Sequence, residues 1–210
     1  MRFLTTSDRM RTNLPVRAVI ALLLTALMGV AAAQAPTDTV RATVEAVLFE
    51  LKTDASEEAR KRRVKQIISE HFDFRAMSSR VLATNWKKAT KRQRSRFTVL
   101  FKELLSNTYW LKISGYENES VEYVGESMRS EKLATVKTMI VTESVQIPVD
   151  YKLFRRDDDR WYAYDVVIEQ VSLVRNYRGS FQQIVRDVGI DGLIGQLETK
   201  VARSSLPAQK

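Results

Sequence analysis

The spacing of apolar residues changes at Gly115, and this change constrains the fold more than any other feature of the sequence. Before Gly115, apolar residues recur at intervals of three and four, which is the period of an amphipathic helix. After it, apolar and polar residues alternate, most regularly over Ile147–Leu153, as in a strand with one buried face. Helical spacing returns after Ser172. A chain with helices on both sides of a run of strands is expected to fold as an α+β domain.

Polar capping residues place the helix boundaries. We predict helices that begin at or near Asp38, Ser56, Asp73, Thr90, Ser172 and Asp191. Asp73 and Ser172 can accept hydrogen bonds from the free N–H groups of a first turn, and Thr90 with Gln93 has the spacing of a capping box. Gly189 is placed to end the helix that follows Ser172.

The alternating segments predict an antiparallel sheet of four strands, over Val121–Met128, Ala134–Glu143, Gln146–Phe154 and Trp161–Ile168. On the last strand, strict alternation places Val166 and Ile168 on one face and Trp161 and Ala163 on the other. The acidic run 157–159 is expected to form the hairpin turn before this strand and not a metal site.

The first 33 residues have the order of a secretory signal peptide. Arg9, Arg11 and Arg17 precede an apolar run over Ala18–Val30, and three alanines follow it. This run has 13 residues, whereas a helix that spans a bilayer needs about 20. We therefore expect residues 1–33 to be removed on export, 34–203 to form a single domain, and 204–210 to be a disordered tail.

The chain carries a net charge of +9 and has no cysteine. Two basic clusters contribute much of this charge: Arg60, Lys61, Arg62, Arg63 and Lys65, and then Lys87, Lys88, Lys91, Arg92, Arg94 and Arg96. Neither is interleaved with the aromatic residues that single-stranded nucleic acid stacks on, so no nucleic-acid partner is expected. The clusters are either solvated helix faces or docking surfaces for anionic lipid headgroups or acidic proteins.

Recognisable catalytic chemistry is absent from the sequence. It has one histidine, His71, and it lacks a nucleophile motif, a glycine-rich phosphate loop and a metal-ligand spacing. We therefore predict no enzyme activity, no metal and no cofactor. The residual enzymatic alternative uses Asp150 or Asp165 as a base beside a tyrosine.

Several segments, taken in order, resemble one known family. They are Phe72-Asp73-Phe74, Val81-Leu82, Trp86, Thr90–Arg94, Val149-Asp150-Tyr151, Trp161–Val174 and Asn176-Tyr177-Arg178. Together they are similar to the MlaC-type periplasmic phospholipid-binding proteins, also called the toluene-tolerance family. Ala83 and Gln170 stand where that family is expected to have glycines.

The resemblance implies a nuclear-transport-factor-like curved sheet, with N- and C-terminal helices packed around an apolar lipid cavity. It further implies a monomeric periplasmic carrier. Such a carrier shuttles phospholipid between an outer-membrane lipoprotein complex and an inner-membrane ABC transporter with its membrane-anchored substrate-binding subunit, which maintains outer-membrane lipid asymmetry. The expected wall of the cavity consists of Leu82, Phe97, Phe101, Leu104, Leu105, Tyr109, Val149, Tyr151, Leu153, Trp161, Val166, Ile168 and Val171.

Three other functions remain open from the sequence. The protein could carry a hopanoid or another apolar lipid, or it could be a small enzyme on the same cavity-bearing scaffold. It could also be a periplasmic adaptor that binds proteins through its basic helices and has a filled core.

Overall fold

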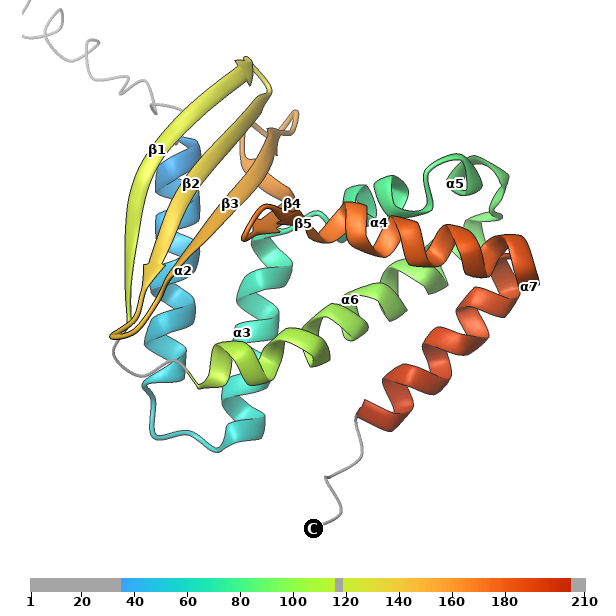
Figure 1. Ribbon diagram of the computed structural model, residues 1–210, viewed down its shortest axis with the longest axis horizontal. Helices are drawn as coiled ribbons and strands as arrows, with labels where there is room; N and C mark the ends of the chain where they lie inside the picture. The colour runs from blue at the N-terminus through green and yellow to red at the C-terminus, as the bar shows by residue number, and fades with distance from the viewer. Residues whose placement is uncertain (1–34, 116–118, 205–210) are drawn as a thin grey trace, which may run out of the picture. The chain divides into compact units, whose positions relative to one another are not determined.

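The computed structural model of the protein describes residues 35–115 and 119–204. The predicted signal peptide, residues 1–33, lies outside this part of the chain, as do residues 205–210 of the predicted tail. The described helices are α2 (Pro36–Leu51), α3 (Glu57–His71), α4 (Phe74–Leu82), α5 (Thr84–Lys88), α6 (Lys91–Ser114) and α7 (Leu173–Ser204). They are shown with the strands in Figure 1.

Four helices begin where the capping residues predict, after Ser56, Asp73, Thr90 and Ser172. Helix α2 instead begins at Pro36, two residues before Asp38, and the predicted start at Asp191 lies within α7. The Asp73 carboxylate accepts from the N–H of Ala76 at 2.7 Å, and the Ser172 hydroxyl accepts from the N–H of Arg175 at 3.1 Å. Thr90 and Gln93 form both bonds of the capping box at the start of α6. Gly189 has a φ of 73° and bends α7 into two segments, as its position predicts.

The sheet has five strands and not the predicted four. They are β1 (Ser120–Ser130), β2 (Leu133–Val141), β3 (Gln146–Arg155), β4 (Trp161–Ile168) and β5 (Val171–Ser172), each antiparallel to the next in chain order. The extra strand arises because Glu169 and Gln170 both have positive φ, 47° and 66°. Two such residues make the tight hairpin turn that returns the chain alongside β4. Ile168 then pairs with Val171.

The side chains of β4 do not alternate between the two sheet faces as predicted, because a β-bulge interrupts the strand. Lys152 of β3 pairs with Asp165, but the next residue, Leu153, pairs with Ala163. Tyr164 is therefore an extra residue, and the alternation changes phase there. As a result, Trp161 and Ala163 lie on the same face as Val166 and Ile168, and not on the opposite face. Tyr164 instead packs among the helices, where the Arg80 guanidinium lies 4.1 Å from the centre of its ring.

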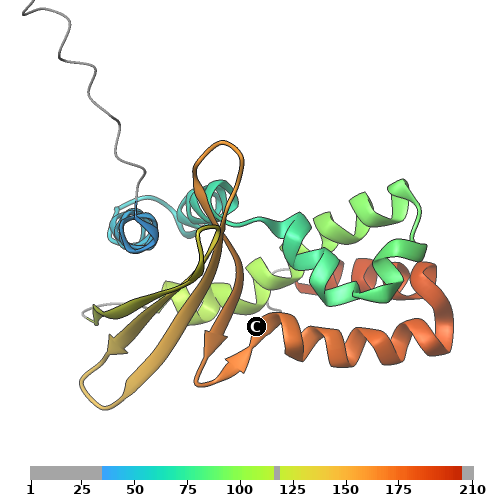
Figure 2. The same ribbon diagram turned by 90° about the horizontal axis from the view of Figure 1, so that it is seen from above.

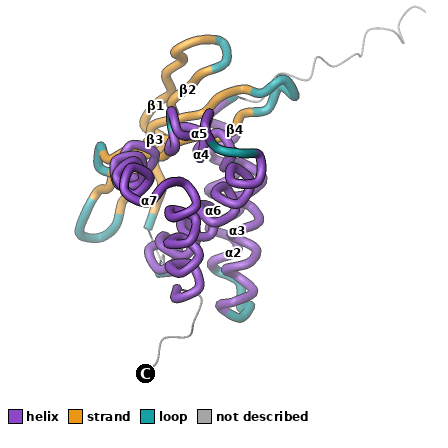
Figure 3. Tube along the Cα trace, turned by 90° about the vertical axis from the view of Figure 1, so that its right-hand side faces the viewer, coloured by secondary structure: helices purple, strands orange, loops and turns teal. Residues whose placement is uncertain are grey.

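Helices flank the curved sheet in two groups. Helices α2 and α3 lie on one side of it, with α2 against β1 and β2 (Figure 2). Helices α4, α6 and α7 pack on one another beside β4 and β5 (Figure 3). The chain between α3 and α4 joins the groups to the sheet, because the N–H of Asp73 donates to the carbonyl of Ala163 at 2.9 Å.

Replacing two residues with glycine should stabilise the protein. Ala83 has a φ of 50° and Gln170 a φ of 66°, a backbone region that costs a residue with a Cβ about 1 kcal/mol or more. We expect Ala83→Gly and Gln170→Gly each to raise the free energy of unfolding by about 1 kcal/mol, measured by urea denaturation. Ala59→Gly, within helix α3, is the control and should lower it by about 1 kcal/mol. A loss of stability at all three positions would contradict this account.

Candidate functional site

The predicted wall residues of the helices pack against one another in a helical cluster. Leu82, Phe97, Phe101, Leu104 and Leu105 are all buried there, none more than 7% exposed. The rings of Phe97 and Phe101 stack with 5.7 Å between their centres, and Phe181 of α7 meets both of them edge-on. These residues form the core that holds α4, α6 and α7 together.

Two predicted wall residues of the sheet belong to a separate sheet cluster. Leu153 and Trp161 are buried against Val40 of α2, together with Ala134 and Val136 of β2. Trp161 reaches this side of the sheet because the bulge at Tyr164 changes the phase of β4.

The sheet and the helices meet at a third group of apolar residues, which we call the apolar junction. Its buried members are Val149, Val166 and Leu173, and its partly buried members are Phe72, Tyr109, Ile140, Ile147, Tyr151 and Ile168. Phe72 and Tyr109 also touch the helical cluster, and Tyr151 also touches the sheet cluster. The junction is thus the place where α6, the start of α7 and the sheet meet, and most of its large apolar side chains are only partly buried.

The structure brings five predicted wall residues together at the junction: Tyr109, Val149, Tyr151, Val166 and Ile168. Val171 is 56% exposed, but it pairs with Ile168 across β4 and β5, so both side chains lie on the same face of the sheet. Sequence reasoning missed Phe72, Ile140, Ile147 and Leu173 as members of this group. Ile147 carried a usable signal, since it alternates in phase with Val149.

Tyrosine hydroxyls in this region are shielded from water. Burial raises the pKa of Tyr151 to about 12, and nearby Tyr123 adds to the effect. Burial also raises the pKa of Tyr109, with a smaller contribution from Tyr177, and it raises the pKa of Tyr177 itself. Tyr109 and Tyr151, which belong to the junction, are therefore uncharged at neutral pH and offer neutral hydroxyls beside apolar surface.

The buried carboxylate next to the junction holds the start of α7. Asp165 accepts from the Ser172 hydroxyl at 2.6 Å, from the N–H of Val174 at 3.0 Å and from Lys152 Nζ at 3.2 Å. Both of its oxygens are therefore engaged, which argues against the role of a free catalytic base.

The other candidate chemical groups are dispersed. Burial lowers the pKa of His71, Glu70 opposes this and Arg160 reinforces it, so the imidazole is neutral at pH 7. Across residues 35–115 and 119–204, no three His, Cys, Asp or Glu side chains are grouped so that they could hold a metal ion.

Within the same ranges, none of the helices has the length and apolar content needed to cross a membrane.

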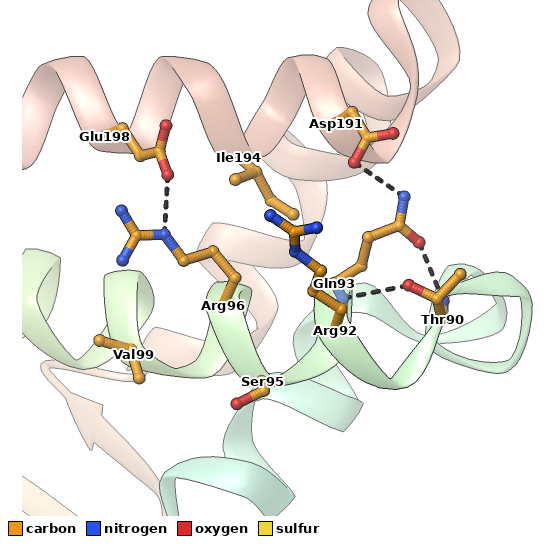
Figure 4. Close-up of a pocket in the computed structure, with 9 residues that line it drawn as sticks. All are labelled: Thr90, Arg92, Gln93, Ser95, Arg96, Val99, Asp191, Ile194 and Glu198. Carbon is orange, nitrogen blue, oxygen red and sulfur yellow. Dashed lines mark hydrogen bonds and ion pairs between the residues drawn. The ribbon is translucent and has the colours of Figure 1, made fainter.

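A groove of about 770 Å³ lies between α6 and the second segment of α7 (Figure 4). Two side-chain bridges span it, because Gln93 donates to Asp191 at 2.8 Å and Arg96 pairs with Glu198 at 2.7 Å. Val99 and Ile194 supply apolar surface, and none of the predicted wall residues lines the groove. It is an open crevice between two helices and not the predicted cavity between sheet and helices.

Comparison with known proteins identifies the family. The sequence profile of the MlaC protein family matches residues 41–199, which is more than half of the chain. The chain belongs to the MlaC family. The resemblance predicted from the sequence is therefore confirmed, and the match includes every helix and strand from α3 to β5.

One relative and one solved structure show how far the similarity extends. The intermembrane phospholipid transport system binding protein MlaC of Haemophilus influenzae is 23% identical over 129 residues. This match covers 60% of each chain, so our protein spans about three fifths of that relative's length. The phospholipid-binding protein of Ralstonia solanacearum, solved in complex with a phospholipid, superposes with a TM-score of 0.74 at 23% identity. It covers 80% of this chain and 97% of its own, which establishes a shared α+β fold.

Proposed function

We propose that this MlaC-family protein is a periplasmic carrier that takes up phospholipid at the apolar junction. In this proposal, it moves lipid between an outer-membrane lipoprotein complex and an inner-membrane ABC transporter complex, and so maintains outer-membrane lipid asymmetry. Membership of a family whose relatives are named for phospholipid binding and intermembrane transport carries the proposal. The signal-peptide pattern of residues 1–33 supports the periplasmic location.

The junction has the surface that an acyl chain needs. Ile140, Ile147 and Ile168 line up on adjacent strands, and each keeps part of its side chain exposed. Tyr109 of α6 faces the same group, and its hydroxyl is uncharged at neutral pH. We assign the acyl chain to this surface, the headgroup to its solvent-exposed rim at Val171, and the helical cluster to the core behind it.

The energetics suit a carrier that exchanges lipid with membranes. Removing an acyl chain of about 16 carbons from water gains roughly 12 kcal/mol, at about 0.8 kcal/mol per CH₂ group. The free energy of the acyl chain differs little between the junction and a bilayer, since both place the acyl chain against hydrocarbon. The protein therefore lowers the cost of crossing water, and the direction of transport must come from its partners.

A charged substitution at the junction should remove the lipid. Ile168→Glu places a carboxylate against the acyl chain, and Val171→Glu places one at the exposed rim with less risk to the fold. We expect native mass spectrometry and lipid extraction of protein from the periplasm to show phospholipid on the wild type. Its occupancy should fall about tenfold or more in Ile168→Glu and less in Val171→Glu.

Val145→Glu is the matched control, because Val145 is a valine of similar exposure, 52% against 56%, in the turn between β2 and β3. It should retain wild-type lipid. A wild-type protein that binds a hopanoid-like lipid would assign a different cargo, and an empty compact protein would overturn the proposal. Unchanged phospholipid in both Ile168→Glu and Val171→Glu would remove the junction as its site.

A further inference from the structure

Helix α5, the start of α6 and the bend of α7 lie at the same end of the helices (Figure 1), and α5 with the start of α6 carries four exposed basic residues. We call them the tip patch: Lys87, Lys88, Lys91 and Arg92. The hydrogen bond from Gln93 to Asp191 joins the start of α6 to the residues just after Gly189. Val188, next to this bend, is 52% exposed, so the same end of the helices also carries an apolar side chain.

The tip patch has charge that the protein does not neutralise. Among the residues that the structure describes, its four side chains have no ion pair, hydrogen bond or ring contact. The nearby acidic residues Asp187 and Asp191 accept hydrogen bonds from Gln183 and Gln93, and within the described residues neither forms an ion pair with the tip patch. The other basic residues of the segment are also held: Arg94 donates to the carbonyls of Trp86 and Lys87, and Arg96 pairs with Glu198.

The composition of the tip favours a membrane over a protein partner. Three of the four cations are lysines, a residue that protein interfaces disfavour and that binds mobile lipid headgroups as a flexible point charge. The neighbouring Trp86 is partly exposed and Val188 is largely so, and such side chains suit the headgroup boundary of a bilayer.

We propose that the tip patch docks the protein on the surface of a membrane that contains anionic phospholipid. The cations contact lipid phosphates, while Val188 and Trp86 lie at the headgroup level. This contact orients the protein on the bilayer and does not require lipid at the apolar junction, so it can be tested separately from the proposed carrier function.

The test compares two double variants with the same change of charge. Lys91→Glu with Arg92→Glu reverses half of the tip patch. Lys61→Glu with Arg62→Glu reverses an adjacent Lys-Arg pair of α3, which also has no side-chain partner among the described residues. The measurement is co-sedimentation with vesicles of phosphatidylcholine alone or mixed with phosphatidylglycerol, at about 0.1 M and about 1 M salt.

We expect wild-type protein to bind only the anionic vesicles, and only at low salt, because the Debye length shortens from about 10 Å to about 3 Å. The tip variant should bind at least about thirtyfold more weakly, since each basic residue at such a surface contributes roughly fivefold. The α3 variant should bind like wild type. Negative charge in the first turn of α6 favours the helix, so circular dichroism should show the tip variant folded.

Three results would overturn the proposal. They are equal binding of wild type to neutral and anionic vesicles, equal weakening by the two double variants, and wild-type binding by the tip variant. The lipid content of the tip variant, measured by mass spectrometry, should match wild type whatever the vesicle result. Lipid loss there would instead show that the substitution disturbs the junction.

Discussion

Phe101→Ala should lower the free energy of unfolding by about 3–5 kcal/mol. Phe101 is fully buried, and its ring lies 5.7 Å from that of Phe97 and 5.3 Å from that of Tyr177. Truncation would leave a cavity where α6 meets α7, and the surrounding rings cannot close it without losing contacts of their own. Urea denaturation of protein from which lipid has been extracted measures the loss.

This experiment separates a packed core from a lipid-lined wall. If Phe101 belongs to a core, Phe101→Ala lowers the free energy of unfolding equally with and without bound lipid. If Phe101 lines the cargo site, most of this decrease disappears in lipid-free protein. Phe49→Ala is the control, because Phe49 is 70% exposed on α2, and it should change stability by less than about 0.5 kcal/mol. A loss below about 1 kcal/mol for lipid-free Phe101→Ala would place Phe101 in the cargo site.

Local chemistry explains which parts of the fold the sequence predicts. Asp73, Thr90 and Ser172 cap helices through bonds to residues only three positions away, so their roles are visible in a short window of sequence. The change of period at Gly115 is also local, and it places the boundary between α6 and β1 correctly.

The predictions for β4 and β5 were wrong because they depend on interactions between residues that a short window of sequence does not contain together. The bulge at Tyr164 exists only because of the register between β3 and β4, so alternation alone misassigned Trp161 and Ala163. The turn into β5 lacks the Asn-Gly or Asp-Gly pair that signals a tight hairpin, since Glu169 and Gln170 occupy it.

The candidate site was predicted only in part for a related reason. Phe101 and Tyr109 lie on the same helix with the same apolar spacing, yet one is fully buried and the other remains partly exposed. Phe101 meets Tyr177 and Phe181 of α7, whereas Tyr109 lies where α6 meets the sheet. Periodicity carries no information about such long-range contacts.

Asp165→Ala should cost about 3 kcal/mol and loosen the helix that borders the junction. The substitution removes the acceptor for the Ser172 hydroxyl, for the N–H of Val174 and for Lys152 Nζ. The Ser172 and Val174 donors are buried and would lose a charged acceptor, whereas Lys152 can turn partly toward water, which moderates the loss. Hydrogen exchange should show faster opening of the first turns of α7.

Asp150→Ala is the matched control, because Asp150 lies on β3 and has no side-chain hydrogen bond or ion pair among the described residues. It should change stability by less than about 0.5 kcal/mol and leave exchange in α7 unaltered. Since α7 begins at Leu173, a buried member of the apolar junction, Asp165→Ala should also reduce bound phospholipid while Asp150→Ala retains it. Equal stability of the two variants would show that Asp165 does not hold α7.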